Sequence, residues 1–427
     1  MKKRCMALLV AGALMLGLFA ACGGQTEQAI EPTPISEPTE YAEPDMSQEE
    51  EPPVALVTDG NPDEAKAAIF AFSQALFREV LALGEENPVI SPLSAYYALA
   101  MVALGAGGET RAEFEAVLGR DPEMLARDLR TLTQQLTGTS GSTILNIAGS
   151  IWAAEEYTII PAFAAAMREY FDAPAMSRDF GAPETVDEIN AWVAERTEGL
   201  IEELIDSIGQ DEVMLLINTL YFSAKWAEAF NPMTEYQGEF RPAHGDAVEI
   251  PFLSTSPGAF SVAMTDVYEA VMLPYDDGRL GFLLVRPTGG ISVREFAVDQ
   301  DLGEVIAGLE MREDVQVRMP KLDMEFEFLL NDLLKAMGLQ EVFGDYSDLS
   351  GLLEEDECLR ISSVLQKVRL LVDEEGTEAA AATVVAIERM GIALNLLELT
   401  FDTPYLYAIY DLETGVPLFM GVLDHPA

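Results

Sequence analysis

The sequence predicts an α+β fold, in which helices and strands segregate along the chain. Apolar residues recur at helical spacing mainly in the early part, whereas runs of β-branched and aromatic residues dominate the later part. Helical and strand patterns do not alternate as they would in a parallel sheet, and no internal repeat is visible. With 427 residues, 49% of them hydrophobic, the chain is long enough to bury a large core.

The first 21 residues have the three-part layout of a secretory signal. Three basic residues are followed by an apolar run over residues 7–19 and by Ala20-Ala21-Cys22. This run is too short to span a bilayer as a helix, so we expect residues 1–21 to be removed. The small residues before Cys22 resemble the lipobox of bacterial lipoproteins, although Phe19 stands where that motif usually has Leu. Acylation of Cys22 would anchor the chain to the bacterial cell envelope or cell surface. The alternative is a soluble secreted protein with an ordinary cleavage site near Cys22.

Residues 22–60 predict an extended tether behind the acylated cysteine. Between residues 25 and 59 the chain has ten carboxylates, six prolines and no base. Such a segment buries too little apolar surface to offset its chain entropy, and its like charges repel one another. The folded domain is therefore expected over residues 61–427. With Cys5 in the signal and Cys22 acylated, Cys358 has no partner for a disulfide.

Four segments carry the signals of helices. Asn61 and Pro62 begin the first as its cap and first-turn proline, and Gly84 ends it. A second helix follows Ser91-Pro92 and runs to the glycine cluster at residues 105–108. This cluster lacks the Lys-Ser/Thr of a phosphate-binding loop and indicates a helix exit. Two more helices are expected near residues 186–208 and 329–337.

The strand signals lie mostly beyond the middle of the chain. They are short runs of β-branched and aromatic residues bounded by glycine, proline or acidic turns. The last two are joined by Glu413-Thr414-Gly415, which predicts a turn. The expected strands cover residues 213–222, 271–275, 281–286, 315–319, 364–372, 405–410 and 416–423.

The composition excludes several classes of function. A net charge of −48, from 25 basic and 73 acidic residues, excludes a nucleic-acid binder that relies on a basic surface. The chain has only two histidines, His244 and His425, so a catalytic triad or a zinc site has almost no residues to draw on. No calcium-binding loop motif is present. We therefore expect neither an enzyme nor a metal or other cofactor.

Residues 373–387 read DEEGTEAAAATVVAI, a glycine followed by small and then β-branched residues. As a strand, this segment places Thr377, Ala379 and Ala381 on one face and Glu378 on the other. Such a strand could enter a sheet because its leading half carries nothing bulky. The alternative is an alanine-rich helix, which the local sequence alone favours.

Four segments, extending together from about residue 61 to residue 426, resemble the serpin family. NPVISPLSAYYALAMVALGAGGET is similar to the family's second-helix motif, and LLINTLYFSAKWAEAFNP to its central strand and the following tryptophan. ISSVLQKVRLLVDEEGTEAAAAT is similar to the strand and hinge that precede the reactive-centre loop. FDTPYLYAIYDLETGVPLFMGVLDHP is similar to the closing strands.

This resemblance implies a single large domain, with helices packed around a large mixed β-sheet, further sheets and an exposed reactive-centre loop at about residues 374–400. It also implies inhibition of serine, or in some cases cysteine, endopeptidases. A target protease attacks the loop and forms an acyl-enzyme, which is trapped when the leading part of the loop inserts into the large sheet. Insertion requires small residues in the hinge. The positions that match the hinge are Glu374, Gly376, Thr377, Ala379, Ala380, Ala381 and Ala382.

The family's spacing from the hinge glycine places the reactive bond at Met390-Gly391. A methionine before the bond would suit elastase-like or subtilisin-like proteases. A shift of one residue would make the bond Arg389-Met390, a bait for trypsin-like enzymes. The segment between Gly391 and Phe401 is longer than the family pattern, so both bonds remain candidates.

Other matching positions belong to the region where the family's large sheet opens. Ser91, Ser94 and Asn218 match polar residues beneath the point where the strands part, and Trp226 matches an aromatic residue at the top. Gln366 stands where many serpins have histidine.

The leading hypothesis is a monomeric, membrane-tethered inhibitor whose partner is a target serine protease. The second hypothesis is a non-inhibitory serpin that acts as an extracytoplasmic protein-binding module through its acidic face. In both cases the acidic charge disfavours a heparin-type polyanion as cofactor, because such polyanions bind basic patches.

Gln366 leads to a prediction about pH. Its amide can donate and accept hydrogen bonds but cannot titrate, whereas histidine titrates near neutrality. We expect no pH response of loop insertion from this position, measured as the inhibition rate against a protease whose own activity is insensitive to pH. A steep change in that rate at about pH 6 that depends on residue 366 would contradict the prediction.

Overall fold

The computed structural model describes residues 9–20, 61–137, 141–230, 235–355, 359–376 and 396–426. Within these residues, no helix has the length and apolarity needed to cross a membrane. The helices are α1 (Pro62–Ala82), α2 (Pro92–Ala103), α3 (Gly108–Leu118), α4 (Pro122–Thr137), α5 (Pro161–Phe171), α6 (Pro183–Arg196), α7 (Val293–Asp299), α8 (Leu302–Ala307), α9 (Asn331–Met337) and the short 3₁₀ helix η2 (Glu341–Phe343).

Six strands form one of the two sheets, here called sheet A. Its β3 and β4 are parallel and its other neighbouring strands antiparallel, so the sheet is mixed, as expected. In spatial order the strands are β12 (Leu322–Leu329), β13 (Leu359–Val372), β1 (Leu9–Ala20), β5 (Glu212–Ser223), β3 (Ile144–Ala154) and β4 (Ala175–Arg178).

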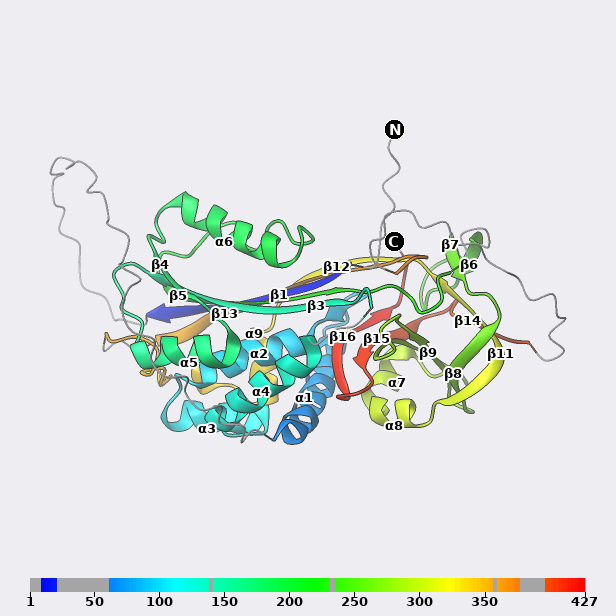
Figure 1. The fold of residues 1–427 in the computed structure, drawn as a ribbon, viewed down its shortest axis with the longest axis horizontal. Coiled ribbons are helices and arrows are strands. Elements are labelled where there is room, and N and C mark those ends of the chain that lie inside the picture. Colours follow the sequence, from blue (N-terminus) through cyan, green and yellow to red (C-terminus); the bar gives the residue numbers. More distant parts are fainter. Residues whose placement is uncertain are drawn as a thin grey trace.

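The second sheet curls beside sheet A, at the right of Figure 1. Strand β14 (Leu397–Thr400) pairs with its β11 outside the main path. In spatial order the other strands are β2 (Val89–Ile90), β16 (Val416–Leu423), β15 (Tyr405–Asp411), β10 (Leu280–Pro287), β9 (Tyr268–Pro274), β8 (Gly258–Met264), β11 (Glu310–Pro320), β7 (Val248–Ser254) and β6 (Tyr236–Phe240). The predicted α+β class, with helices around a large sheet and a further sheet, is confirmed.

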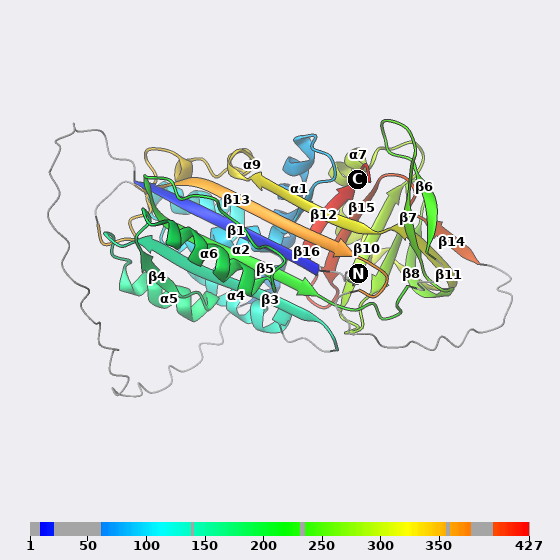
Figure 2. The ribbon, with the colours of Figure 1, turned by 90° about the horizontal axis from the view of Figure 1, so that it is seen from above.

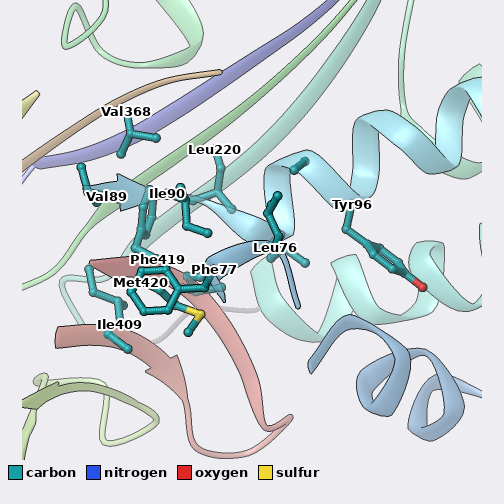
Figure 3. Close-up of a cluster of buried hydrophobic side chains, with 14 of the residues drawn as sticks. Leu76, Phe77, Val89, Ile90, Tyr96, Leu220, Val368, Ile409, Phe419 and Met420 are labelled. Atoms are coloured by element: carbon teal, nitrogen blue, oxygen red, sulfur yellow. The ribbon is translucent and has the colours of Figure 1, made fainter. Parts of the chain in front are cut away.

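Helices cover both faces of sheet A. Figure 1 shows α6 on one face, with α2, α4, α5 and α9 on the other. All twelve residues of α2 are buried, which explains why its sequence, PLSAYYALAMVA, has no polar stripe. Figure 3 shows one part of the core, where side chains from α1, α2, β2, β15 and β16 meet Leu220 of β5 and Val368 of β13. Helix α2 is therefore the fixed support beneath the middle of sheet A.

The end of the first helix follows the prediction, but its cap differs in detail. Pro62 occupies the first turn, and Gly84 follows the helix with a φ of 77°, in the left-handed region that glycine adopts freely. The Asn61 side chain makes no capping bond to the backbone. It donates instead to the Glu64 carboxylate, with a distance of 2.8 Å from Nδ2 to Oε1.

The helix expected over residues 186–208 is wrong in its second half. Helix α6 ends at Arg196, and Gly199 follows with a φ of 77°, which turns the chain away from the helix axis. The apolar residues beyond this point pack on sheet A without helical structure. Asn190 fixes them by accepting from the Ile205 N–H at 3.1 Å and donating to the Ile205 carbonyl at 2.7 Å.

The segment predicted to be the apolar part of a removed signal is the strand β1 in this chain. Seen from above, β1 lies between β13 and β5 (Figure 2). It is antiparallel to both neighbours over almost its whole length. Removal of residues 1–21 stays a prediction. While the segment is attached, it lies in the middle of sheet A.

Candidate functional site

The site lies where β5 and β13 part in the middle of sheet A. Both strands run antiparallel to β1, so they are parallel to each other and share no hydrogen bonds. Leu14 of β1 stands opposite Asn218 on one side and Gln366 on the other. Two of the polar residues predicted from the sequence therefore face each other across one position of the central strand.

Beneath this position, Gln366 is tied to the first turn of α2. Its Oε1 accepts from the Ser91 N–H at 3.3 Å, and its Nε2 donates to the Ser91 carbonyl at 2.9 Å. Ser91 caps α2 by accepting from the Ser94 N–H at 3.4 Å, while its hydroxyl donates to the Leu418 carbonyl at 3.0 Å. Gln366 and Ser91 are fully buried, so these bonds have no water to replace them.

On the other side of the parting, Ser94 holds Asn218. The Ser94 hydroxyl donates to Asn218 Oδ1 at 2.9 Å, and Asn218 Nδ2 donates to the Ala148 carbonyl at 3.4 Å. Helix α2 thus binds β13 through Gln366 and β5 through Asn218. The predicted sheet-opening residues meet in one buried network that joins both strands to the same helix end.

The amide of Gln366 suits this arrangement better than a titrating ring would. It meets a neighbouring N–H and C=O of one residue with one acceptor and one donor at the same time. The fully buried glutamine side chain carries no charge at any pH, so it avoids the desolvation cost that a protonated histidine would have at this position.

Above the parting, Trp226 forms the centre of an aromatic cluster. Its ring stacks on Tyr275 with centroids 4.7 Å apart and meets Phe230 and Phe282 edge to face at 5.6 and 5.9 Å. Its Nε1 donates to the Asp373 carbonyl at 2.9 Å. The aromatic residue predicted from the sequence therefore holds the end of β13 at the top of the site.

The hinge lies against this cluster. The Phe230 N–H donates to the Glu374 carbonyl at 2.8 Å, and Gly376 forms an isolated antiparallel bridge with Lys225, just beyond the end of β5. Gly376 has a φ of 87°, and a Cβ there would lie 2.5 Å from the Ala224 carbonyl oxygen. Only glycine fits this conformation and this close approach of two backbones. The predicted hinge residues Glu374 and Gly376 thus lie at the top of the gap.

Charge at the hinge is strongly acidic, with one lysine facing it. Lys321 Nζ lies 2.8 Å from the Glu374 carboxylate and 3.1 Å from Glu235. The pKa of the Asp373 carboxyl is raised from 3.8 to about 7, chiefly by burial and to a smaller extent by the neighbouring Glu374 and Glu375. The Glu375 N–H, which donates to Asp373 at 2.9 Å, and the Lys321 ammonium oppose this increase.

Sequence reasoning did not identify Tyr275, Lys321 or Asp373. Asp373 stands in the acidic run that precedes the hinge glycine, which was a signal for charge but not for burial. Tyr275 and Lys321 come from distant strand ends, and nothing in their local sequence connects them with the hinge.

Several predicted site residues lie outside the residues that the structure describes. They are the hinge residues Thr377, Ala379, Ala380, Ala381 and Ala382, the candidate reactive-bond residues Arg389, Met390 and Gly391, and the lipidation residue Cys22.

The two histidines line one open pocket of about 770 Å³, together with residues of the segments around Gly84, Arg294 and Asp424. The Ser292 hydroxyl in this pocket donates to Glu295 at 2.7 Å within a helix capping box. His425 Nδ1 lies 2.9 Å from the carbonyl of its neighbour Pro426. These are the contacts of a helix start and a closing strand, and they pair no nucleophile with a base. Among the described residues, no group of three or more histidine, cysteine or acidic side chains could hold a metal ion.

Comparison with known proteins gives the same family throughout. A family model described as serpin (serine protease inhibitor) matches residues 67–426. Human neuroserpin is 30% identical over 382 residues, covering 86% of this chain and 92% of the relative. An uncharacterized serpin-like protein of Thermococcus kodakarensis is 31% identical over 431 residues, covering 97% of each chain. The native-state crystal structure of the thermophilic serpin tengpin superposes with a TM-score of 0.75 at 28% identity, covering 84% of this chain and 94% of that one.

The chain therefore belongs to the serpin family, as the resemblance implied. Members of this family are generally inhibitors or binding proteins that perform no catalysis of their own. Sheet A of the described structure corresponds to the large sheet of the serpin fold.

Asp373 gives the site a pH dependence of predictable sign. Because its folded-state pKa is raised from 3.8 to about 7, the native protein holds a proton that the unfolded chain has released between these values. We expect the free energy of unfolding to decrease as the pH rises through this window. Above it the ionised carboxylate weakens the docking of the hinge.

Urea unfolding across this pH range, with Asp373→Asn as the test variant, checks this expectation. The asparagine cannot ionise, so its curve should lose the downward slope. An identical slope in both proteins would show that another group is responsible. In the Asp373→Asn variant, the inhibition rate can also be measured against pH without the titration of Asp373. Any pH dependence that comes from residue 366 can then be seen separately.

Proposed function

We propose that this chain is a serpin-type suicide inhibitor of serine endopeptidases, with cysteine endopeptidases as a further class of target. The observation that carries the proposal is the position of the hinge. Glu374 and Gly376 lie at the top of the gap between β5 and β13, bonded to Phe230 and paired with Lys225. The chain then continues into Thr377, Glu378 and four alanines, and Thr377 and the alanines are small enough to enter a packed sheet.

The mechanism follows from this position. A protease attacks the loop as a substrate and forms an acyl-enzyme at Met390-Gly391 or Arg389-Met390. Once the bond is cut, the part of the loop attached to Gly376 can enter the gap and pair with β5 and β13 on both sides. The backbone hydrogen bonds and apolar burial gained there favour insertion over release, and the attached protease is distorted before water completes hydrolysis.

A surface tether fits the rest of the chain. We propose that a lipid on Cys22 holds the inhibitor at the bacterial envelope, and that the acidic segment 25–59 spaces it from the anionic surface. A monomeric inhibitor at this place would protect surface proteins from exogenous proteases. A relative from Drosophila melanogaster, 32% identical over 341 residues, is named as a serine protease inhibitor.

Incubation of the exported, processed chain with trypsin, elastase and subtilisin tests the proposal. We expect a covalent complex that survives SDS with at least one of them. Mass spectrometry of the released C-terminal fragment then identifies the bond, because a fragment that begins at Gly391 assigns Met390-Gly391 and one that begins at Met390 assigns Arg389-Met390. Clean nicking by every protease, with no complex, would favour the non-inhibitory binding module.

Thr377→Arg tests the insertion step itself. An arginine on the inserting face must bury an unpaired charge, so insertion should slow by about 100-fold or more and the variant should become a substrate. Its cleavage at the same bond shows that the loop is still presented. The matched control is Glu378→Arg, one residue further on the outward face, which should still form the complex. Normal inhibition by Thr377→Arg would rule out insertion as the mechanism.

A further inference from the structure

We propose that the chain that still carries residues 1–21 is autoinhibited by its own apolar N-terminal segment. Strand β1 fills the position in sheet A that the reactive-centre loop must enter. The inference rests on the proposed function, which requires loop insertion. It assigns a second role to residues 9–20, beyond that of an export signal.

The direction of β1 is the direction that an inserting loop would take. Its first residue, Leu9, stands opposite Ser223 at the top of β5, and its last, Ala20, stands opposite Leu359 at the bottom of β13. The hinge approaches the same gap from the same end, because Gly376 pairs with Lys225 only two residues beyond Ser223. Strand β1 runs down the gap from the top, and a loop inserted after Gly376 would run the same way, antiparallel to the same two strands.

The register shows that the two segments compete for the same partners. If the antiparallel pairing of Gly376 with Lys225 continues down β5, residue 378 comes opposite Ser223, where Leu9 now stands. The same register brings residue 389 opposite Glu212, where Phe19 now stands after the bulge in β1. Strand β1 thus occupies the positions on β5 that loop residues 378–389 would need, from the second residue beyond the hinge glycine to the candidate reactive bond.

The sequence of β1 suits a central strand better than the sequence of the loop does. Both faces of sheet A are covered, by α2 on one side and α6 on the other, and strands buried on both faces are near-continuous apolar runs. The β1 sequence LVAGALMLGLFA has no charged residue, whereas residues 378–389, EAAAATVVAIER, include three. Displacing β1 would also cost the hydrogen bonds of two strand pairs.

Removal of the signal therefore has a consequence for activity as well as for location. While the segment is attached, the gap is filled and an attacked loop has nowhere to insert, so the chain is cleaved as a substrate. Once residues 1–21 are released, the edges of β5 and β13 become available. An unprocessed molecule inside the cell would in this way spare the cell's own proteases.

The test uses the full chain, residues 1–427, purified from a cytosol that lacks the export route so that the segment stays attached. Leu14→Pro places a proline in β1, opposite both Asn218 and Gln366, where a central strand cannot accommodate one. The matched control is Ile30→Pro, in the acidic segment that already has six prolines. A second variant, Leu16→Pro, replaces Leu14→Pro if that chain fails to fold.

Two readouts are compared, amide hydrogen exchange of β5 and β13 and the rate of inhibition of trypsin or elastase. The unsubstituted chain and Ile30→Pro should protect both strands and inhibit slowly. Leu14→Pro should exchange faster in both strands and inhibit about tenfold faster or more, because it loses at least one ladder hydrogen bond.

The two readouts separate this inference from the proposed function. Faster exchange in Leu14→Pro, with no inhibition by that variant or by the processed chain, would mean that β1 fills the gap but that the chain is not an inhibitor. Unchanged exchange in β5 and β13, whatever the inhibition rates, would overturn the inference. Equal inhibition by the unsubstituted full chain and the processed chain would overturn it as well.

Discussion

The backbone edges of β5 and β13 are the constraint on which the rest of this structure depends. Two parallel strands in the middle of a buried sheet, not bonded to each other, present facing rows of N–H and C=O groups that need partners. A segment placed between them gains two ladders of hydrogen bonds at once. Filling the gap is therefore strongly favourable, and the identity of the filling segment decides what the molecule can do. In the full chain that segment is β1, and in the proposed mechanism it is the cleaved loop.

Hydrogen bonds hold the strands around the gap both below it and above it. Below it, one buried network ties Gln366 of β13 and Asn218 of β5 to the start of α2, so both strands are held to a common support. Above it, Trp226 and Phe230 bind the backbone where β13 passes into the hinge. Gly376 itself pairs with Lys225 at the mouth of the gap, with a φ of 87°. Rigidity below and a bonded hinge above are consistent with the proposed insertion of the loop from the top of the gap.

Charge has a different meaning in each part of this very acidic chain. The basic N-terminus belongs to the predicted signal, and the acidic segment that follows contributes ten carboxylates and no base. At the hinge, negative charge is held in a partly buried place, where Lys321 neutralises Glu374 and burial raises the pKa of Asp373 to about 7. Most of the net charge of −48 therefore contributes to solubility, whereas the acidic residues at the hinge affect the stability of the docked hinge.

The sequence by itself determined the fold class, the family, the buried helix α2, the strands β5, β13, β15 and β16, and the residues of the parting. These elements have long apolar runs or motifs whose local pattern agrees with their tertiary role. It missed α3, α4, α5 and several outer strands, and it extended α6 past Gly199. In short amphipathic segments and at glycine turns, packing against neighbouring elements decides which secondary structure forms and where it ends. Only the tertiary structure brought Lys321, Tyr275 and Asp373 to the hinge. Only it placed residues 9–20 in sheet A, because an apolar run has no fixed secondary structure of its own and becomes a strand where two unpaired strand edges supply its hydrogen bonds.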